Sequence, residues 1–210
     1  MFLAGIALVS DAAAQISGIP IRNAGVTGGF GLAADFGLGS VKSPGDNDKS
    51  RALGVTGALG FGPLGLSAGV IRTTIDPAMG PNVSQTSLAA AAQFAVFGGP
   101  LVPLKVTWQA GLIQPFDAPE GASKPWRGHL GVGAALAIPA VAVSIRPWVA
   151  PRVDLIRVDG TQIKGAVSGG VDFGLLSGLG FRLAYDSRLG WAGEDRSASG
   201  FSVGVGYHFR

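Results

Sequence analysis

Two histidines and a scattered set of charged residues are the side chains of this 210-residue sequence that could do chemistry. His129 follows a polar segment with Asp117 and Glu120, where an imidazole could act as general base for a protease or an acyltransferase. The alternative is a solvated histidine at the rim of the fold. His208 falls at the opposite end of the topology inferred below, so no pair of histidines is expected to share a metal. We therefore expect no enzyme, no cofactor and no metal site.

One glycine motif suggests a nucleotide site and is rejected. Residues 60–65 (GFGPLG) match G-x-G-x-x-G, but no helix follows, and Pro63 with the renewed alternation beyond it predicts a hairpin turn instead. The net charge of +3 is dispersed, and no basic cluster is interleaved with aromatics, so nucleic acid is not an expected partner.

The charged residues are the group of side chains most able to carry a function. The residues expected to line an interior are Asp35, Lys105, Arg146, Arg152, Asp154, Asp172, Arg182, Asp186 and Arg188. In one interpretation, which also includes Lys164, they pair across neighbouring strands and plug a narrow lumen, because unpaired charge in a confined space is unfavourable. In the other, their basic excess lines a thin, mildly anion-selective path kept open by glycine and alanine.

Strict alternation of apolar and small or polar residues defines the elements that must position these charges. A period of two indicates β-strands. Ten strands are expected, at 26–38, 53–61, 64–70, 88–96, 104–112, 130–138, 143–153, 167–175, 179–191 and 201–209.

The alternation divides each strand into two sets of residues, or phases, one on each face of the sheet. The composition of the two phases decides which face meets lipid and which faces the interior. The apolar phase carries no charge except Arg72, whereas the other phase holds the charges, both histidines and many small residues. Ten tilted strands leave no room inside for so many Leu, Phe and Trp side chains, whereas lipid accepts them outside. The apolar phase should therefore face lipid. A soluble periplasmic lipid-binding barrel would need the phases inverted.

Turn signals alternate along the chain and predict the topology. Four connections are tight, at Gly62-Pro63, Gly98-Gly99-Pro100, Pro139-Ala140 and Ser177-Gly178. Five are expected to be longer and polar, at 39–52, 74–86, 114–127, 156–163 and 192–199. An even count brings the first strand antiparallel beside the last and closes the sheet. We predict an all-β, closed, antiparallel, up-and-down transmembrane barrel of ten strands, or of eight if one hairpin is loop.

Helical membrane segments are the competing interpretation of two stretches. The uncharged run 130–145 is shorter than the ~20 residues that a spanning helix needs, and Pro139 interrupts it. The Ala-rich segment 88–97 fits a helix as well as a strand. Cysteine is absent, which excludes disulfides.

The N-terminus suggests export. Residues 2–9 are apolar and residues 11–15 (DAAAQ) fit a cleavage site after Ala14, so 1–14 is expected to be a truncated signal peptide and 15–210 a single barrel domain.

The last strand carries a family resemblance. Phe201, Val203, Val205, Tyr207 and Phe209 alternate with small or polar residues up to the closing Arg210. This pattern resembles the C-terminal strand of small Gram-negative outer-membrane β-barrels of the porin-like superfamily. The resemblance implies an outer-membrane location with periplasmic termini, contact with outer-membrane lipid, and recognition of this strand by the barrel assembly machinery.

Aromatic residues of the lipid-facing phase are expected to form interfacial girdles. They are Phe30, Phe36, Phe61, Trp108, Tyr185, Trp191, Tyr207 and Phe209. The role expected for the protein is structural, adhesive or a minor permeation role, and the alternative is an outer-membrane enzyme acting at the extracellular rim.

One ion pair follows from the turn position alone. If a turn is centred near Ser177, residues equidistant from it face each other, which places Asp172 opposite Arg182 on the inward face. We expect a salt bridge between them.

Overall fold

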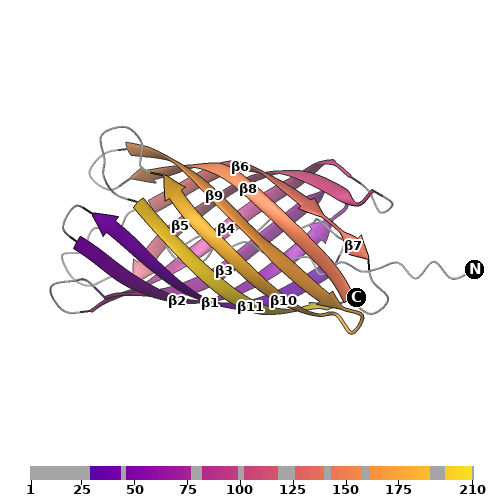
Figure 1. Ribbon diagram of the computed structural model, residues 1–210, viewed down its shortest axis with the longest axis horizontal. Coiled ribbons are helices and arrows are strands. Elements are labelled where there is room, and N and C mark those ends of the chain that lie inside the picture. The colour runs from indigo at the N-terminus through magenta and orange to yellow at the C-terminus, as the bar shows by residue number, and fades with distance from the viewer. Residues whose placement is uncertain are drawn as a thin grey trace, which may run out of the picture.

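The computed structural model is a barrel of obliquely running strands (Figure 1). It describes residues 29–43, 46–76, 82–98, 102–117, 126–139, 143–157, 161–189 and 197–209. The expected signal segment 1–14, together with Val26, Trp191 and Arg210, lies outside the described residues.

Ten long strands and one two-residue strand make a single antiparallel sheet. The strands are β1 (Gly29–Ser43), β2 (Asp46–Phe61), β3 (Leu64–Asp76), β4 (Val83–Phe97), β5 (Leu104–Asp117), β6 (Trp126–Leu136), β7 (Ile138–Pro139), β8 (Val143–Arg157), β9 (Thr161–Leu175), β10 (Leu179–Leu189) and β11 (Ser197–Phe209). Sequential neighbours pair except β6 and β7, which both pair with β8, and β1 pairs with β11, so the sheet closes into a barrel. The ten-stranded, up-and-down barrel predicted from the sequence is confirmed.

The barrel has a terminal end and a loop end. The terminal end is where β1 begins at Gly29 and β11 ends at Phe209, and the loop end is the opposite one. At the terminal end, Gly62 and Pro63 form the β2–β3 turn, and residues 176–178 form the β9–β10 turn, where the Gly178 amide donates to the Leu175 carbonyl oxygen at 3.0 Å. Gly62 and Gly178 have φ of 59° and 90°, a region that glycine adopts without strain. Both tight turns were predicted.

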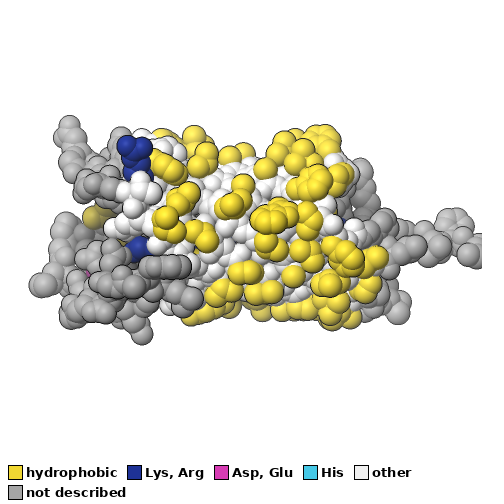
Figure 2. Space-filling view, turned by 90° about the horizontal axis from the view of Figure 1, so that it is seen from above, with side chains coloured by type: hydrophobic (Ala, Val, Ile, Leu, Met, Phe, Trp, Pro, Cys, Tyr) yellow, Lys and Arg dark blue, Asp and Glu magenta, His cyan; other side chains and the backbone are white. Residues whose placement is uncertain are grey.

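The predicted phase is confirmed along the described strands. The apolar phase is exposed on the outside, as with Leu53 at 60% and Leu112 at 59%, whereas the small and charged phase is buried inside. Figure 2 shows hydrophobic side chains spread over the barrel wall. Polar residues inside and apolar residues outside are the arrangement of a barrel that crosses a bilayer, and they contradict a soluble lipid-binding barrel.

The expected loop boundaries were wrong at the loop end. Residues 39–43 and 46–52 belong to β1 and β2, which pair up to Ser43 and Asp46, and β8 and β9 extend to Arg157 and Thr161. Strands β3, β4, β5, β6 and β11 likewise run into the segments assigned to loops. The physical reason is that backbone pairing continues where both faces of a strand are polar, so the alternation stops before the strand does.

The structure corrects one further assignment and decides between two interpretations of another segment. Pro139 was expected in a hairpin turn, but it lies in β7 opposite Ser144, after a break at Ala137 between β6 and β7. A proline is compatible with this position because β7 lies beside a break in the ladder. The Ala-rich segment is strand β4, not helix. In the described part of the chain, no helix is long and apolar enough to span a membrane.

Candidate functional site: the ion-paired interior

The inward charged residues lie mainly on one side of the barrel. Arg146, Arg152 and Asp154 come from β8, Asp172 from β9, and Arg182, Asp186 and Arg188 from β10, while Asp35 on β1 and Lys105 on β5 flank them. Except for the half-buried Lys105, their exposed fractions are 0–8%. The facing strands β2, β3 and β4 contribute small or uncharged inward residues, such as Thr56, Ile71 and Ser87. The interior is therefore asymmetric in charge.

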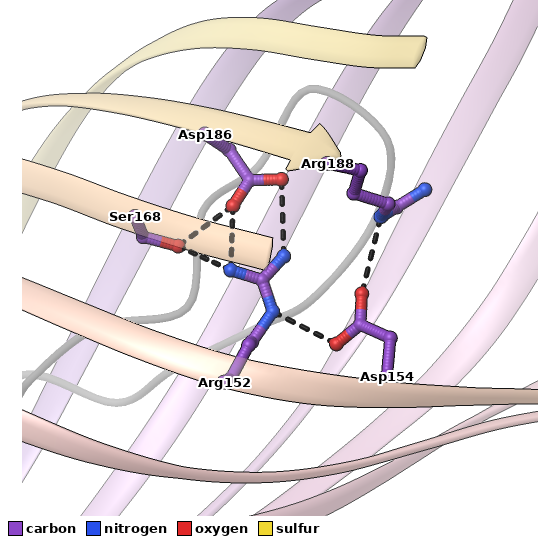
Figure 3. Close-up of polar contacts among 5 residues, drawn as sticks. All are labelled: Arg152, Asp154, Ser168, Asp186 and Arg188. Atoms are coloured by element: carbon purple, nitrogen blue, oxygen red, sulfur yellow. Dashed lines mark hydrogen bonds and ion pairs between the residues drawn. The ribbon is translucent and has the colours of Figure 1, made fainter. Parts of the chain in front are cut away.

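A five-residue network lies toward the loop end (Figure 3). Arg152 donates to both carboxylate oxygens of Asp186, at 2.7 and 3.1 Å, and its Nε donates to Asp154 Oδ1 at 2.8 Å. Ser168 accepts from Arg152 at 2.6 Å and donates to Asp186 at 2.7 Å. Arg188 completes the network through Asp154 Oδ2 at 3.1 Å. These contacts join β8, β9 and β10 from the inside by charge-assisted hydrogen bonds.

A second network lies nearer the terminal end, and it contains the predicted pair. Arg182 and Asp172 face each other in the β9–β10 register, and Arg182 Nε donates to Asp172 Oδ1 at 3.3 Å. Arg182 also reaches Asp35 Oδ1 at 3.2 Å, although β11 lies between β10 and β1.

Glycine at one β11 position permits that second contact. Gly204 is the register partner of both Asp35 and Arg182, and a Cβ at this position would overlap the Asp35 carboxylate. The absent side chain therefore lets an ion pair pass over β11 and link the first strand to the tenth.

An apolar group lies between the levels of the two networks, where Trp148 and Ala184 both face Gly170 in the register. Trp148 lies between Arg146 and Arg152 in sequence on the same face, is 5% exposed, and packs with Ala135, Ala150 and Ala184. Its ring is held over Gly170, where a Cβ would come within 2.9 Å of the indole. Neither Trp148 nor Ser168 was predicted from the sequence as a site residue, although their inward phase was the available signal.

The expectation of a solvated His129 at the rim of the barrel was wrong. It is 6% exposed inside the barrel, and its ring occupies the space left by Gly111 on β5. Its register partner is Asp154, but that carboxylate turns toward Arg152 and Arg188, and neither ring nitrogen of His129 has a hydrogen-bond partner among the described residues. The described residues around His129 place no serine or carboxylate in hydrogen-bond contact with its ring.

The predicted aromatic residues fall into two groups. Phe30, Phe61, Tyr207 and Phe209 lie at or near strand ends on the terminal side, all exposed, with Phe30 and Phe209 stacked at 5.5 Å between ring centroids and Tyr207 and Phe209 edge-on at 4.9 Å. The others that the structure describes, in strand interiors, are Phe36, Trp108 and Tyr185.

Metal binding has no candidate site in the described ranges, where no three His, Cys, Asp or Glu residues cluster suitably. The arrangement of charges instead serves to hold strands together from within.

Comparison with known proteins identifies the fold. No protein-family model matches the sequence, and no curated protein matches it in sequence. Among solved structures, the β domain of the Bordetella autotransporter BrkA superposes with a TM-score of 0.65 at 14% identity, covering 86% of this chain and 100% of that one. The Neisserial surface protein A gives a TM-score of 0.45 at 15% identity over 86% and 97% of the two chains. The translocator domain of NalP from Neisseria meningitidis gives 0.48 at 14% identity over 87% and 89%.

The fold and the apolar exterior define the class of protein. This chain is a small transmembrane β-barrel, similar in fold to the β domain of BrkA. At 14% identity the likeness concerns the fold alone.

Proposed function

We propose that the protein is a closed, non-conducting β-barrel of the Gram-negative outer membrane that acts as a structural platform. The observation that carries this proposal is the burial and mutual pairing of the charges in the two networks, with Arg152 making three ion-paired hydrogen bonds to Asp154 and Asp186 at exposed fractions of 0–7%. The charged residues of both networks are at most 8% exposed. An open path would leave these side chains in contact with water.

An anion-selective path receives less support from the same geometry. Such a path needs unneutralised cations along an open wall. The guanidinium groups of Arg152 and Arg182 instead form ion pairs with carboxylates of other strands. Trp148 and its alanine neighbours further fill the space between the two networks.

The orientation and partners belong to the same proposal. The termini face the periplasm and the loop end faces outward, as in outer-membrane barrels with short periplasmic turns. Outer-membrane lipid covers the exposed apolar phase, and the alternating strand β11, ending at Phe209, is the segment that the assembly machinery recognises. The proposed role is not enzymatic: His129 is enclosed, and among the described residues its ring has no hydrogen-bond partner.

Cysteine labelling in a bilayer tests the closed interior, because the native chain contains no cysteine. Thr107 faces inward at 0% exposure, and Asp76 is exposed at the loop end. With the refolded barrel in lipid vesicles, a water-soluble thiol reagent should modify T107C far more slowly than the control D76C. Equal labelling of the two variants would show a water-filled interior and contradict the proposal.

A further inference from the structure

Two arginines stand on the outward phase near the loop end. Arg72 on β3 is exposed and faces Leu53 on β2, and Arg51, two residues before Leu53, is exposed on the same face. The two arginines are therefore diagonal cross-strand neighbours, a spacing that long side chains can bridge.

Their surroundings fix their level in the membrane. On one side lie the exposed Leu53, Val55 and Val70 of the lipid-facing belt. On the other, Lys49 faces Asp76 across β2 and β3, and polar Thr74 and Ser84 join through their hydroxyls at 3.0 Å. A cation on the lipid face is tolerated near an interface and not at the midplane, so the arginines mark the boundary between acyl chains and headgroups.

The described neighbours leave both guanidinium groups without a carboxylate. Neither Arg51 nor Arg72 forms a side-chain hydrogen bond or ion pair with a described residue. Asp76 faces Lys49, and Asp117, two strands from Arg72, accepts a hydrogen bond from Thr86 at 3.5 Å. Two adjacent cations at a lipid boundary would repel one another unless an anion lies between them.

We propose that Arg51 and Arg72 bind the phosphate of a membrane lipid in the leaflet at the loop end. The planar guanidinium group recognises phosphate with two parallel hydrogen bonds, so two arginines can converge on one headgroup. The acyl chains of the same lipid would lie along Leu53, Val55 and Val70. The inference rests on the proposed transmembrane placement of the barrel.

Lipid binding to the refolded, detergent-solubilised barrel tests this site, with phosphatidic acid as the probe and native mass spectrometry as the readout. The double variant R51Q/R72Q should bind phosphatidic acid on the order of 30-fold more weakly than the wild type. Arg157 provides a matched control, because it is also exposed at the loop end but lies on β8, on the other side of the barrel. The variant R157Q should bind as the wild type does.

Three results separate the alternatives. Unchanged binding by R51Q/R72Q, or an equal loss in R157Q, would overturn the site. Binding of inorganic phosphate alone that displaces phosphatidic acid would assign the site to a free anion and overturn the lipid. Insertion of each variant into vesicles, followed by its heat-dependent migration on gels, is measured in parallel. A failure of insertion in the wild type would contradict the proposed function, whereas normal insertion without lipid preference would contradict only this inference.

Discussion

Removing the Arg152 guanidinium should destabilise the barrel strongly, and we choose R152M as the perturbation because methionine keeps much of the side-chain length. In the native barrel Arg152 is 7% exposed and pairs with Asp186 and Asp154. After the substitution Asp154 keeps Arg188 at 3.1 Å, but Asp186 loses both guanidinium contacts and keeps the Ser168 hydroxyl. The buried carboxylate of Asp186 is thus left without the guanidinium group that neutralised its charge.

The expected magnitude follows from the burial. Removing one member of a buried ion pair destabilises a protein by about 3–5 kcal/mol, whereas an exposed pair contributes about 0.2–1 kcal/mol. The double variant R152M/D186L removes both charges, and replacing a buried pair with apolar groups is often neutral. The double variant should therefore recover more than half of the stability that R152M loses.

Urea unfolding in lipid vesicles measures these free energies, followed by the fluorescence of the four tryptophans. Reversibility is checked by refolding from urea, and S187A, which alters a residue of β10 outside the network, is the control. A loss below about 1 kcal/mol in R152M would be the value of a solvated pair, and it would refute the reasoning that the interior excludes water.

Two other substitutions and one deletion test the phase, the closure and the terminal strand. V132R places a charge on the lipid face of β6 and should lower the unfolding free energy by about 2–4 kcal/mol if this position lies near the bilayer midplane; unchanged stability would count against the assigned face. G204A should weaken or displace the Asp35–Arg182 contact and lower the unfolding temperature, and a crystal structure retaining the contact at 3.2 Å would argue against the proposed role of this glycine. Deleting Phe209 with Arg210 should lower the yield of barrel in the outer membrane, so an unaffected yield would remove the proposed recognition of β11.

The fold could be predicted from the sequence because a transmembrane barrel imposes the same alternation on every strand. Lipid outside and a narrow interior leave each residue only two environments, and the hydropathy of residues such as Leu53 and Thr56 reports them directly. The ends of the strands could not be predicted in the same way. Beyond the lipid belt both faces are polar, so residues such as Lys42 and Asn47 pair in the ladder without any alternation.

Local pairing in the interior was also predictable, whereas distant pairing was not. Asp172 and Arg182 follow from one tight turn, because a known turn fixes the register of the hairpin. The contact of Arg182 with Asp35 spans the closure of the barrel and depends on the empty position at Gly204, which no pattern within a single hairpin indicates. The same holds for Asp186 and Arg152, which come from β10 and β8 with β9 between them.

Conductance across a planar lipid bilayer tests the closed interior most directly. The refolded protein, with its insertion verified by protease protection and heat-dependent migration, should give no current steps above background in neutral salt solution, while a porin added to the same apparatus confirms detection. Reproducible steps with a preference for anions would contradict a closed barrel. They would favour a basic path along the wall that carries Arg146, Arg152 and Arg182.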